Sequence, residues 1–337
     1  MKFVYVAVGN DYDMITYSQT AKVTSDVAYW PDPYHSLRGL RKALFTAHNS
    51  SRINSVIRLP FRGIWSDVFL PERIKKELDG EDRICFIFNE FVFQYLGNGI
   101  PGVLKKRFPG SVSVCLFDDR VEKISPVFGF DVAKKAAELF DFVLTYDGRD
   151  ARDYGMIYSR PSLIDYSFVP DDPSVPASDV FYVGRAKDRL DTLIEVYDKC
   201  SEAGLAPLFY IIEVPEERIV PRPGIVYNRR LSYGQLLRFV KRSRAVVNIT
   251  QKGAEGITLR DYEAFSMNKY LITNNPIITG SPFYTPEKVI LLDSLPGGLA
   301  TMRPENDSIP WNGTEEYSAV RYYEWLAGLV FRASDEG

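Results

Sequence analysis

Two short stretches of the sequence combine glycine with charged side chains in a pattern that suits a phosphorylated ligand. In the first, Gly184 is followed by three cations, Arg185, Lys187 and Arg189. Glycine lets the backbone turn tightly, guanidinium groups bind phosphate oxygens in a bidentate way, and an ammonium group acts as a point charge. A basic turn that faces solvent is the alternative. The stretch therefore predicts a diphosphate site.

The second stretch is AEGITLRDYEAFSMNKYLITNN, residues 254–275, which predicts a glycine, a short helix and then a strand. Thr258 is the expected N-cap, so backbone N–H groups and the positive helix end face the space before the helix. Arg260 and Glu263 share one helix face, where the carboxylate can accept hydrogen bonds from a ribose diol. Pairing of these two side chains on the surface is the alternative. An anion, and in particular a nucleotide diphosphate, suits this stretch.

Short apolar runs alternate with helical patterns along the chain, as in parallel sheets covered by helices. In the first half we expect strands at 2–8, 83–88, 111–117 and 141–147, and helices at 36–48, 90–107 and 131–140. In the second half we expect strands at 179–184, 207–214, 224–228, 244–250, 270–275 and 288–293, and helices at 188–203, 232–243 and 257–267. Ligands of open α/β sheets bind outside the carboxyl ends of the strands, so the loops there are the ones that matter.

A stretch at 158–179 with four prolines and no clear period separates the two halves, and we take it as the linker. The expected divisions are a first domain at 1–165, a second at 166–312 and a C-terminal helix at 313–337 that packs back on the first domain. Thr314 can N-cap that helix, with acidic residues in its first turn. The sequence thus predicts two doubly wound α/β domains.

Composition excludes several classes of protein. The 337 residues carry a net charge of −3, which gives the whole chain no basic footprint for nucleic acid. Cys85, Cys115 and Cys200 have no CxxC spacing and the chain has two histidines, so we expect reduced cysteines and no structural zinc. No apolar run approaches the roughly 20 residues of a membrane span, and the apolar N-terminal run is too short for a signal peptide. A cytoplasmic protein is expected.

Three segments in order, VFYVGRAKDRL, YNRRLSYGQLLRFVKRSRAVVNIT and GITLRDYEAFSMNKYLITNN, resemble the nucleotide-binding half of GT-B glycosyltransferases. The resemblance covers residues 178–280 and is greatest to bacterial enzymes of capsule, exopolysaccharide or lipopolysaccharide synthesis. It implies a GT-B fold, an α/β architecture of two Rossmann-like domains facing a cleft, with the C-terminal helix crossing back to the first domain. It also implies a metal-independent, hexosyltransferase-type enzyme that moves a sugar from a nucleotide diphosphate sugar to a saccharide acceptor, with a lipid-linked acceptor expected.

The resemblance assigns a donor site in the second domain. It implies that Arg185 with Lys187 or Arg189 contacts the diphosphate, that residues 227–230 hold the base, and that Glu263 binds the ribose. Backbone N–H groups that follow the glycine approach the phosphate. The donor-binding residues are Gly184, Arg185, Lys187, Arg189, Asn228, Arg229, Gly256, Ile257, Thr258, Leu259, Arg260 and Glu263.

By the same resemblance the first domain binds the acceptor and supplies any general base, which an inverting transfer needs to take the hydroxyl proton. Polar residues at its strand ends are Asp11 and Asp13, Asn89 and Glu90, and Asp118, Asp119 and Arg120. At each position a cap or loop residue is the alternative. Many retaining members carry a second glutamate at the position of Glu255, so the stereochemical course stays open. The catalytic candidates are Asp11, Asp118, Asp119 and Glu255.

No metal and no cofactor are expected. The Asp-Tyr-Asp at 11–13 matches a metal-binding pattern of a different glycosyltransferase fold only superficially, without the context of that fold. In the GT-B interpretation, arginine, lysine and a helix end neutralise the phosphate charge. The Lys-Arg-Ser-Arg run at 241–244 is expected to be a cluster at a helix C-terminus.

Residues 34–49 predict a basic amphipathic helix that includes His35 and His48. Its apolar stripe is Leu37, Leu40, Leu44 and Phe45. Such a helix can lie on the anionic inner face of a membrane, where lipid-linked acceptors occur, or it can pack on a sheet with its basic residues in water. Two other functions stay open: a nucleotide-sugar epimerase, and a non-catalytic nucleotide-binding partner of an active transferase.

Overall fold

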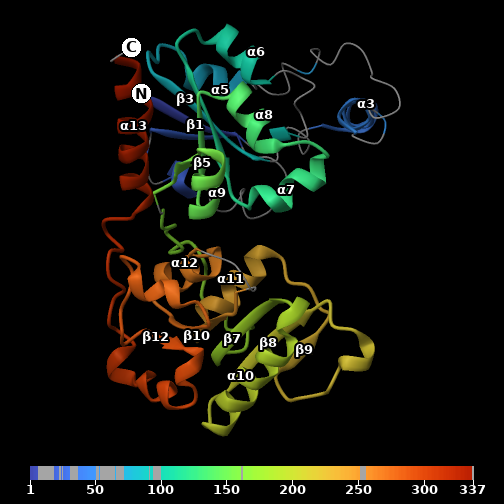
Figure 1. Cartoon of the computed structure of the whole chain (residues 1–337), viewed down its shortest axis with the longest axis vertical. Coiled ribbons are helices and arrows are strands. Elements are labelled where there is room, and N and C mark those ends of the chain that lie inside the picture. The colour runs from blue at the N-terminus through green and yellow to red at the C-terminus, as the bar shows by residue number, and fades with distance from the viewer. Residues whose placement is uncertain are drawn as a thin grey trace. The chain divides into compact units, whose positions relative to one another are not determined.

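The computed structural model divides the chain into two compact units (Figure 1). Unit 1 comprises Met1–Pro161 and Val320–Gly337, and unit 2 comprises Ser162–Ala319. The structure describes residues 1–6, 19–22, 24, 26–30, 37–50, 53, 65, 72–90, 92–93, 100–160, 162–250 and 256–335. The chain therefore passes from one unit to the other twice.

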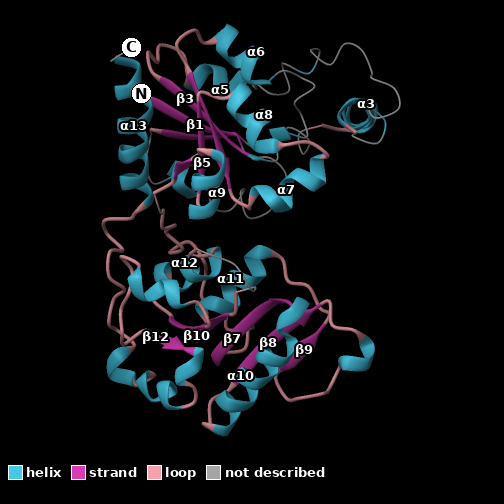
Figure 2. Cartoon of the chain, viewed as in Figure 1, coloured by secondary structure: helices cyan, strands magenta, loops and turns pink. Residues whose placement is uncertain are grey.

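Unit 1 contains a parallel six-stranded sheet in the order β2-β1-β3-β4-β5-β6. Figure 2 draws its strands in magenta. The strands are β1 (Lys2–Val6), β2 (Val27–Trp30), β3 (Ile84–Asn89), β4 (Val112–Phe117), β5 (Phe142–Thr145) and β6 (Ile157–Tyr158). The central strands are nearly continuous apolar runs because both faces of a parallel sheet are buried. In β1, Val4 and Val6 face one core, and Phe3 and Tyr5 face the other.

Helices cover both faces of this sheet. The helices are α3 (Gly39–Asn49), α5 (Glu72–Glu77), α6 (Ile100–Arg107), α7 (Val121–Phe128), α8 (Val132–Leu139), α9 (Gly148–Tyr154) and α13 (Ala319–Asp335). Phe45 of α3, Leu104 of α6 and Ile124 of α7 belong to one core. On the other face, α13 packs Tyr323 against Phe3, with ring centroids 5.1 Å apart. The C-terminal helix thus returns to the first sheet, as expected.

The C-terminal helix begins later than predicted. It starts at Ala319, and Thr314 is not its N-cap, because residues 312–317 form turns. The Thr314 hydroxyl donates to the carbonyl of Trp311 at 3.3 Å, and Ser318 forms a parallel bridge with Leu163. The turn before this bridge is closed by a hydrogen bond from the N–H of Tyr317 to the carbonyl of Gly313 at 3.0 Å, so the helix begins only after Ser318.

Unit 2 contains a second parallel sheet in the order β12-β11-β10-β7-β8-β9. Its elements are β7 (Ser178–Arg185), α10 (Leu190–Glu202), β8 (Pro207–Ile212), β9 (Ile225–Tyr227), α11 (Tyr233–Lys241), β10 (Ser243–Asn248), α12 (Leu259–Ser266), β11 (Tyr270–Thr273) and β12 (Val289–Leu291). Counted from β7, this is the strand order of a Rossmann sheet, in which the direction of winding reverses between the first and fourth strands. The switch point is therefore between β7 and β10.

Most expected strands and helices of both halves are present with shifted ends. In the first half, the structure also contains elements that had not been predicted, namely β2, β6, α5, α7 and α9. The expected helix at 90–107 appears as α6 from Ile100, and residues 91 and 94–99 lie outside the described part.

Candidate functional site

The carboxyl ends of β7 and β10 define the candidate site in unit 2, because a crevice forms where the winding of a doubly wound sheet reverses. Strand β7 ends in Gly184 and Arg185. A Cβ atom on Gly184 would lie 2.6 Å from the hydroxyl oxygen of Tyr182, so this position accepts only glycine without a rearrangement. The first glycine stretch is therefore placed at the switch point.

The cations of this loop have distinct partners. The Arg189 guanidinium donates to the carbonyls of Ile249 and Arg185, both at 2.6 Å, and thereby ties the end of β7 to the end of β10. Arg185 is about half exposed, and its Nε lies 3.2 Å from Oε1 of Glu213. Glu213 also holds Arg230 at 3.3 Å. Arg189 is thus a structural tie, whereas Arg185 lies at the surface, where a ligand can reach it.

Three of the four non-glycine residues with positive φ in the described part follow consecutive strands at this edge. Lys187, Glu213 and Asn228 have φ of 45°, 61° and 56°. Such conformations are costly and are concentrated at functional sites. The Asn228 side chain exchanges two hydrogen bonds of 2.9 Å with the backbone of Val214, so it fixes the loops after β8 and β9.

The start of α12 is held by a buried polar cluster. Thr258 occupies the N-cap position, as predicted, and its N–H donates to the Asp261 carboxylate at 2.7 Å. The Asn248 amide donates to Oγ1 of Thr258 at 2.9 Å and to Asp261 at 2.6 Å. Burial raises the pKa of Asp261 to about 6, although these hydrogen bonds favour its charged form.

These bonds change the expected anion site in one respect. The Thr258 N–H was expected to face an anion, but it donates its hydrogen bond to the Asp261 carboxylate instead. The first intrahelical bonds run from Asp261 and Tyr262 to the Thr258 carbonyl. The N–H groups of Leu259 and Arg260 therefore come before the helical hydrogen-bond ladder, at the positive end of the helix.

The two asparagines after β11 fasten neighbouring loops to this edge. Asn274 accepts hydrogen bonds from the N–H and hydroxyl of Thr250, at 2.7 and 3.0 Å. Asn275 donates its side-chain amide to the carbonyl of Gly256 at 2.8 Å. The end of β11 thus positions the glycine that precedes α12.

Glu263 and Arg260 form an ion pair, but the pair is not on the surface, because Glu263 is fully buried. Its Oε1 is sealed from solvent and has no hydrogen-bond partner among the described residues. Burial raises the pKa of Glu263, while Arg260 and a hydrogen bond from Tyr233 act in the opposite direction. A buried, unpaired carboxylate oxygen is costly, and a ligand hydroxyl is a suitable donor for it.

In unit 1, Asp118 follows β4, and its backbone N–H donates to the Glu90 carboxylate at 3.0 Å. Oδ2 of Asp118 is sealed from solvent, without a hydrogen-bond partner in the described part of the chain. Burial first, and then the charge of Asp119, raise the pKa of Asp118 to about 7. Asp119 is about half exposed and lies 3.4 Å from Lys123. The two carboxylates therefore differ, and Asp118 is the one poised to exchange a proton near neutral pH.

Other candidates lie outside the described residues, namely Asp11, Asp13, His35 and Glu255. Within the described ranges, no group of three or more histidine, cysteine or acidic side chains is arranged to hold a metal ion. His48 accepts a hydrogen bond from the Trp65 indole at 2.8 Å.

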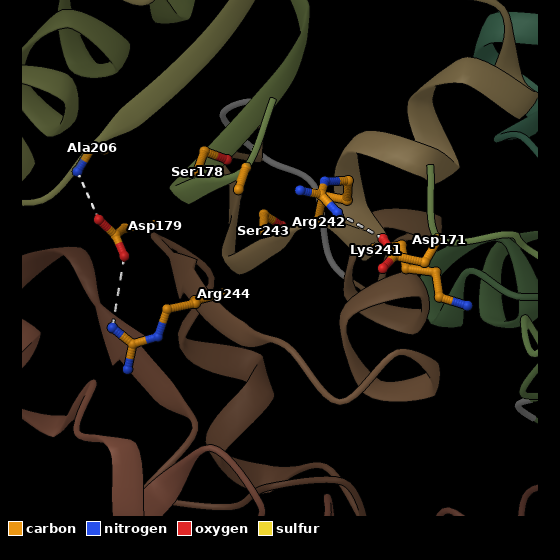
Figure 3. Close-up of a pocket in the computed structure, with 9 residues that line it drawn as sticks. Asp171, Ser178, Asp179, Ala206, Lys241, Arg242, Ser243 and Arg244 are labelled. Atoms are coloured by element: carbon orange, nitrogen blue, oxygen red, sulfur yellow. Dashed lines mark hydrogen bonds and ion pairs between the residues drawn. The ribbon is translucent and has the colours of Figure 1, made fainter. Parts of the chain in front are cut away.

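A hollow of about 560 Å³ lies at the opposite, amino-terminal end of the second sheet (Figure 3). It includes Arg242 and Arg244 of the basic run after α11. Arg242 pairs with Asp171 at 2.9 Å, and Arg244 lies 3.7 Å from Asp179. Because helix C-termini carry partial negative charge, Arg242, the C-cap of α11, is placed where it stabilises the helix end. Arg244 lies in β10 and also pairs with Asp307 at 3.0 Å. The run is therefore a structural cluster, as expected.

Sequence reasoning missed Glu213, Tyr233, Asn248 and Asp261. One signal was available for Asp261, because Thr258 and an acidic residue three positions later form the pattern of a capping box. The partners of Asn248 and Tyr233 come from other segments of the chain, so local spacing gave no indication of them.

No protein-family model matches the sequence, and no curated protein matches it. Solved structures do match. An alpha-glucosyltransferase in complex with UDP-glucose and DNA containing an abasic site has a TM-score of 0.55 at 10% identity, over 99% of this chain and 98% of that one. An alpha,alpha-trehalose-phosphate synthase (UDP-forming) from Burkholderia vietnamiensis has a TM-score of 0.53 at 10% identity, with the same coverage. An alpha-glucosyltransferase in complex with UDP and a 13-mer DNA has a TM-score of 0.51 at 11% identity, again over 99% and 98%. The chain therefore has the GT-B fold of glycosyltransferases.

Proposed function

We propose that the protein is a glycosyltransferase that uses a nucleotide diphosphate sugar as donor. The observation that carries this proposal is the sealed, unpaired oxygen of Glu263 next to the N-terminus of α12, at the switch point of a Rossmann sheet. A ribose hydroxyl would satisfy the carboxylate oxygen, and a diphosphate would bind at the helix end. The complexes of similar fold with UDP and UDP-glucose support the same ligand class.

The donor residues would act on the leaving group. As the bond between the anomeric carbon and the diphosphate oxygen breaks, negative charge develops on the nucleotide diphosphate. Arg185, Lys187 and the N-terminal end of α12 would stabilise this charge, and charge stabilisation of this kind is often the largest single contribution to catalysis. No metal ion is required in this scheme.

We assign the general base to Asp118 in an inverting transfer. Its carboxylate would take the proton from an acceptor hydroxyl while the hydroxyl oxygen forms its bond to the anomeric carbon. A group with a pKa of about 7 is well matched to this task at neutral pH. Asp119 raises that pKa and is better placed as the modulating charge than as the base.

The proposed acceptor is a saccharide on a lipid carrier, as in bacterial surface polysaccharide synthesis. Among the helices of the described residues, none is long and apolar enough to cross a membrane. In α3, however, Phe45 is buried while Leu40 and Leu44 remain 76% and 48% exposed. The neighbouring Arg38 and Arg41 are also exposed, so this face suits peripheral contact with anionic lipid.

Thermal stabilisation by nucleotides tests the donor site. UDP, GDP, dTDP, CMP and ADP are added to the native chain, to Glu263→Ala and to a control, Asp198→Ala, which breaks an ion pair with Arg222 elsewhere in unit 2. A ligand at about 100 times its dissociation constant adds ~2.7 kcal/mol to stability. We expect one diphosphate to stabilise the native and control chains but not Glu263→Ala. If no nucleotide stabilises the native chain, the proposal is wrong. If a nucleotide binds but no sugar is transferred to acceptor or water, the protein is instead a non-catalytic nucleotide-binding partner of an active transferase.

A further inference from the structure

Two tyrosine side chains connect the candidate ribose-binding carboxylate to the segment by which the chain passes into unit 2. The hydroxyl oxygens of Tyr166 and Tyr233 lie 2.8 Å apart. Tyr166 is almost completely buried, and Tyr233 is the first residue of α11. Neither hydroxyl has a role in the donor chemistry described above.

In the hydrogen bond between the two tyrosine hydroxyls, the donor can be assigned. The Tyr233 hydroxyl bonds to Glu263, and an ionised carboxylate only accepts hydrogen bonds. Tyr233 therefore donates its single proton to Glu263, which leaves Tyr166 as the donor to Tyr233. The charge of Glu263 also contributes to the raised pKa of Tyr166, after burial, so the two groups are close. A directed chain runs from Tyr166 through Tyr233 to Glu263.

Tyr166 belongs to residues 162–169, which we call the crossover segment. At its start, the N–H of Leu163 donates to the carbonyl of Tyr317 at 2.8 Å, next to the point where the chain leaves unit 2. At its end, the N–H of Val169 donates to the Tyr166 carbonyl at 3.0 Å, and Lys241 donates to the Val169 carbonyl. Tyr166 is thus the middle attachment of this segment to unit 2.

We propose that Tyr166 and Tyr233 are positioning residues that couple the occupancy of Glu263 to the order of the crossover segment. This inference rests on the proposed function, because it takes a nucleotide as the occupant. Oε1 of Glu263 has no partner in the described part of the chain, so a ligand hydroxyl there would fix the carboxylate in one orientation. A fixed carboxylate holds Tyr233, and Tyr233 holds Tyr166. Ordering one end of a hydrogen-bond chain reduces the cost of ordering the other.

The first test is nucleotide affinity. UDP, GDP and dTDP are titrated by calorimetry into the native chain, Tyr233→Phe and a control, Tyr197→Phe, in which a buried hydroxyl that bonds to the Pro223 carbonyl is lost from the same unit. Losing a hydrogen bond to a charged group predicts a roughly 10-fold weaker affinity for Tyr233→Phe. The control is expected to bind like the native chain.

The second test is hydrogen exchange of the amides of residues 163–169. We expect a bound nucleotide to slow exchange there in the native chain and in Tyr197→Phe, but not in Tyr233→Phe or Tyr166→Phe. If Tyr233→Phe binds with native affinity and shows the same slowing, the coupling is wrong. A general loss of structure in Tyr233→Phe would appear as faster exchange throughout unit 2. In that case Tyr166→Phe tests the coupling: slowing of exchange at residues 163–169 by bound nucleotide in this variant would show that the coupling is wrong.

A third measurement separates this inference from the proposed function. If none of the three nucleotides binds the native chain, the donor proposal fails. Exchange of residues 163–169 is then compared without ligand in the native chain and in Glu263→Gln, whose amide is a weaker acceptor for Tyr233. Faster exchange in Glu263→Gln would still support the tyrosine link, whereas unchanged exchange would overturn it.

Discussion

The side-chain amide of Asn275 donates a hydrogen bond to the carbonyl of Gly256 at 2.8 Å, and this bond joins the end of β11 to the glycine before α12. The Asn275 carbonyl oxygen accepts from the N–H of Ile277 at 3.2 Å, so both ends of the amide are used. Asn275 is 3% exposed. One buried side chain therefore fixes the position of Gly256, just before α12 and the candidate phosphate site.

Replacing Asn275 with alanine should lower stability and weaken nucleotide binding together. Leaving a buried carbonyl unpaired costs about 1–3 kcal/mol, and Gly256 loses its hydrogen bond to Asn275, which follows β11. Chemical denaturation and calorimetric titration with the diphosphate that binds would measure the two effects. Asn312→Ala is the control, because its exposed amide bonds to the Tyr284 carbonyl instead. Native affinity in Asn275→Ala would contradict a positioning role.

Asp118→Asn should abolish most sugar transfer without weakening donor binding. Removing a general base lowers the rate by about 10²- to 10⁴-fold. In the native chain, kcat/KM should rise with pH through about 7, because the carboxylate must be deprotonated to accept the hydroxyl proton. Asp119→Asn should keep most of the activity and shift this rise to lower pH, since it removes a charge that raises the pKa of Asp118. Equal losses in both variants would count against the assignment of the base.

Stability should also depend on pH through Asp118. Its pKa is about 7 in the folded chain, against an ordinary value of 3.8, so the folded state binds the proton more tightly between these values. The free energy of unfolding therefore falls as pH rises from about 4 to about 7, and the full penalty is present above pH 7. Asp118→Asn should be more stable than the native chain at pH 8 by on the order of 1–3 kcal/mol, and this gain should vanish near pH 4. Urea unfolding at both pH values checks this; a gain independent of pH would exclude titration as its cause.

Gly184→Ala should destabilise unit 2 by roughly 1–3 kcal/mol, because the new methyl group overlaps the Tyr182 hydroxyl. Adding Tyr182→Phe removes the nearest atom and should recover part of the loss. Thermal unfolding of the two single variants and the double variant would measure the coupling. If the stability changes of the two single variants simply add up in the double variant, the added methyl group does not clash with the Tyr182 hydroxyl.

The exposed face of α3 can be tested with vesicles. The native chain should pellet with vesicles of anionic phosphatidylglycerol and not with neutral phosphatidylcholine, and high salt should release it. Replacing Leu40 and Leu44 with serine removes the exposed apolar groups and should weaken binding, while the buried Phe45 still anchors the helix in unit 1. Thr46→Ala, which alters another exposed position of α3, is the matched control. If the native chain does not bind anionic vesicles, the proposed membrane contact should be dropped.

The second sheet could be predicted from sequence because its strands are compact apolar runs separated by helices with clear periodicity. RAVVNIT and YLITNN, for example, correspond to β10 and β11. The location of the candidate site was predicted from one general rule, since loops at the carboxyl ends of parallel strands meet at one edge. The same reasoning missed β2 in the first sheet, because VAYW is a run of only four residues, although Asp26 and Pro31 flank it.

The roles of individual side chains were harder to predict because they depend on partners distant in sequence. Arg189 has the residue type and spacing of a phosphate ligand, yet it bonds to the Ile249 carbonyl. Glu263 and Arg260 were recognised as a pair, but their burial depends on the packing of α11 and on Tyr233. Spacing along a helix indicates which face two residues share, and it does not indicate what covers that face.

The return of α13 to the first sheet has a consequence for folding during translation. Phe3 and Tyr5 are made long before Tyr323 and Leu326, which complete their face of the sheet. All of unit 2 is synthesised in between. At about 5–20 residues per second, the nascent first sheet waits for roughly 10–30 seconds with that apolar face uncovered. Unit 2 can therefore reach its native state before the unit that precedes it, and the uncovered face is the surface that a chaperone would protect during this delay.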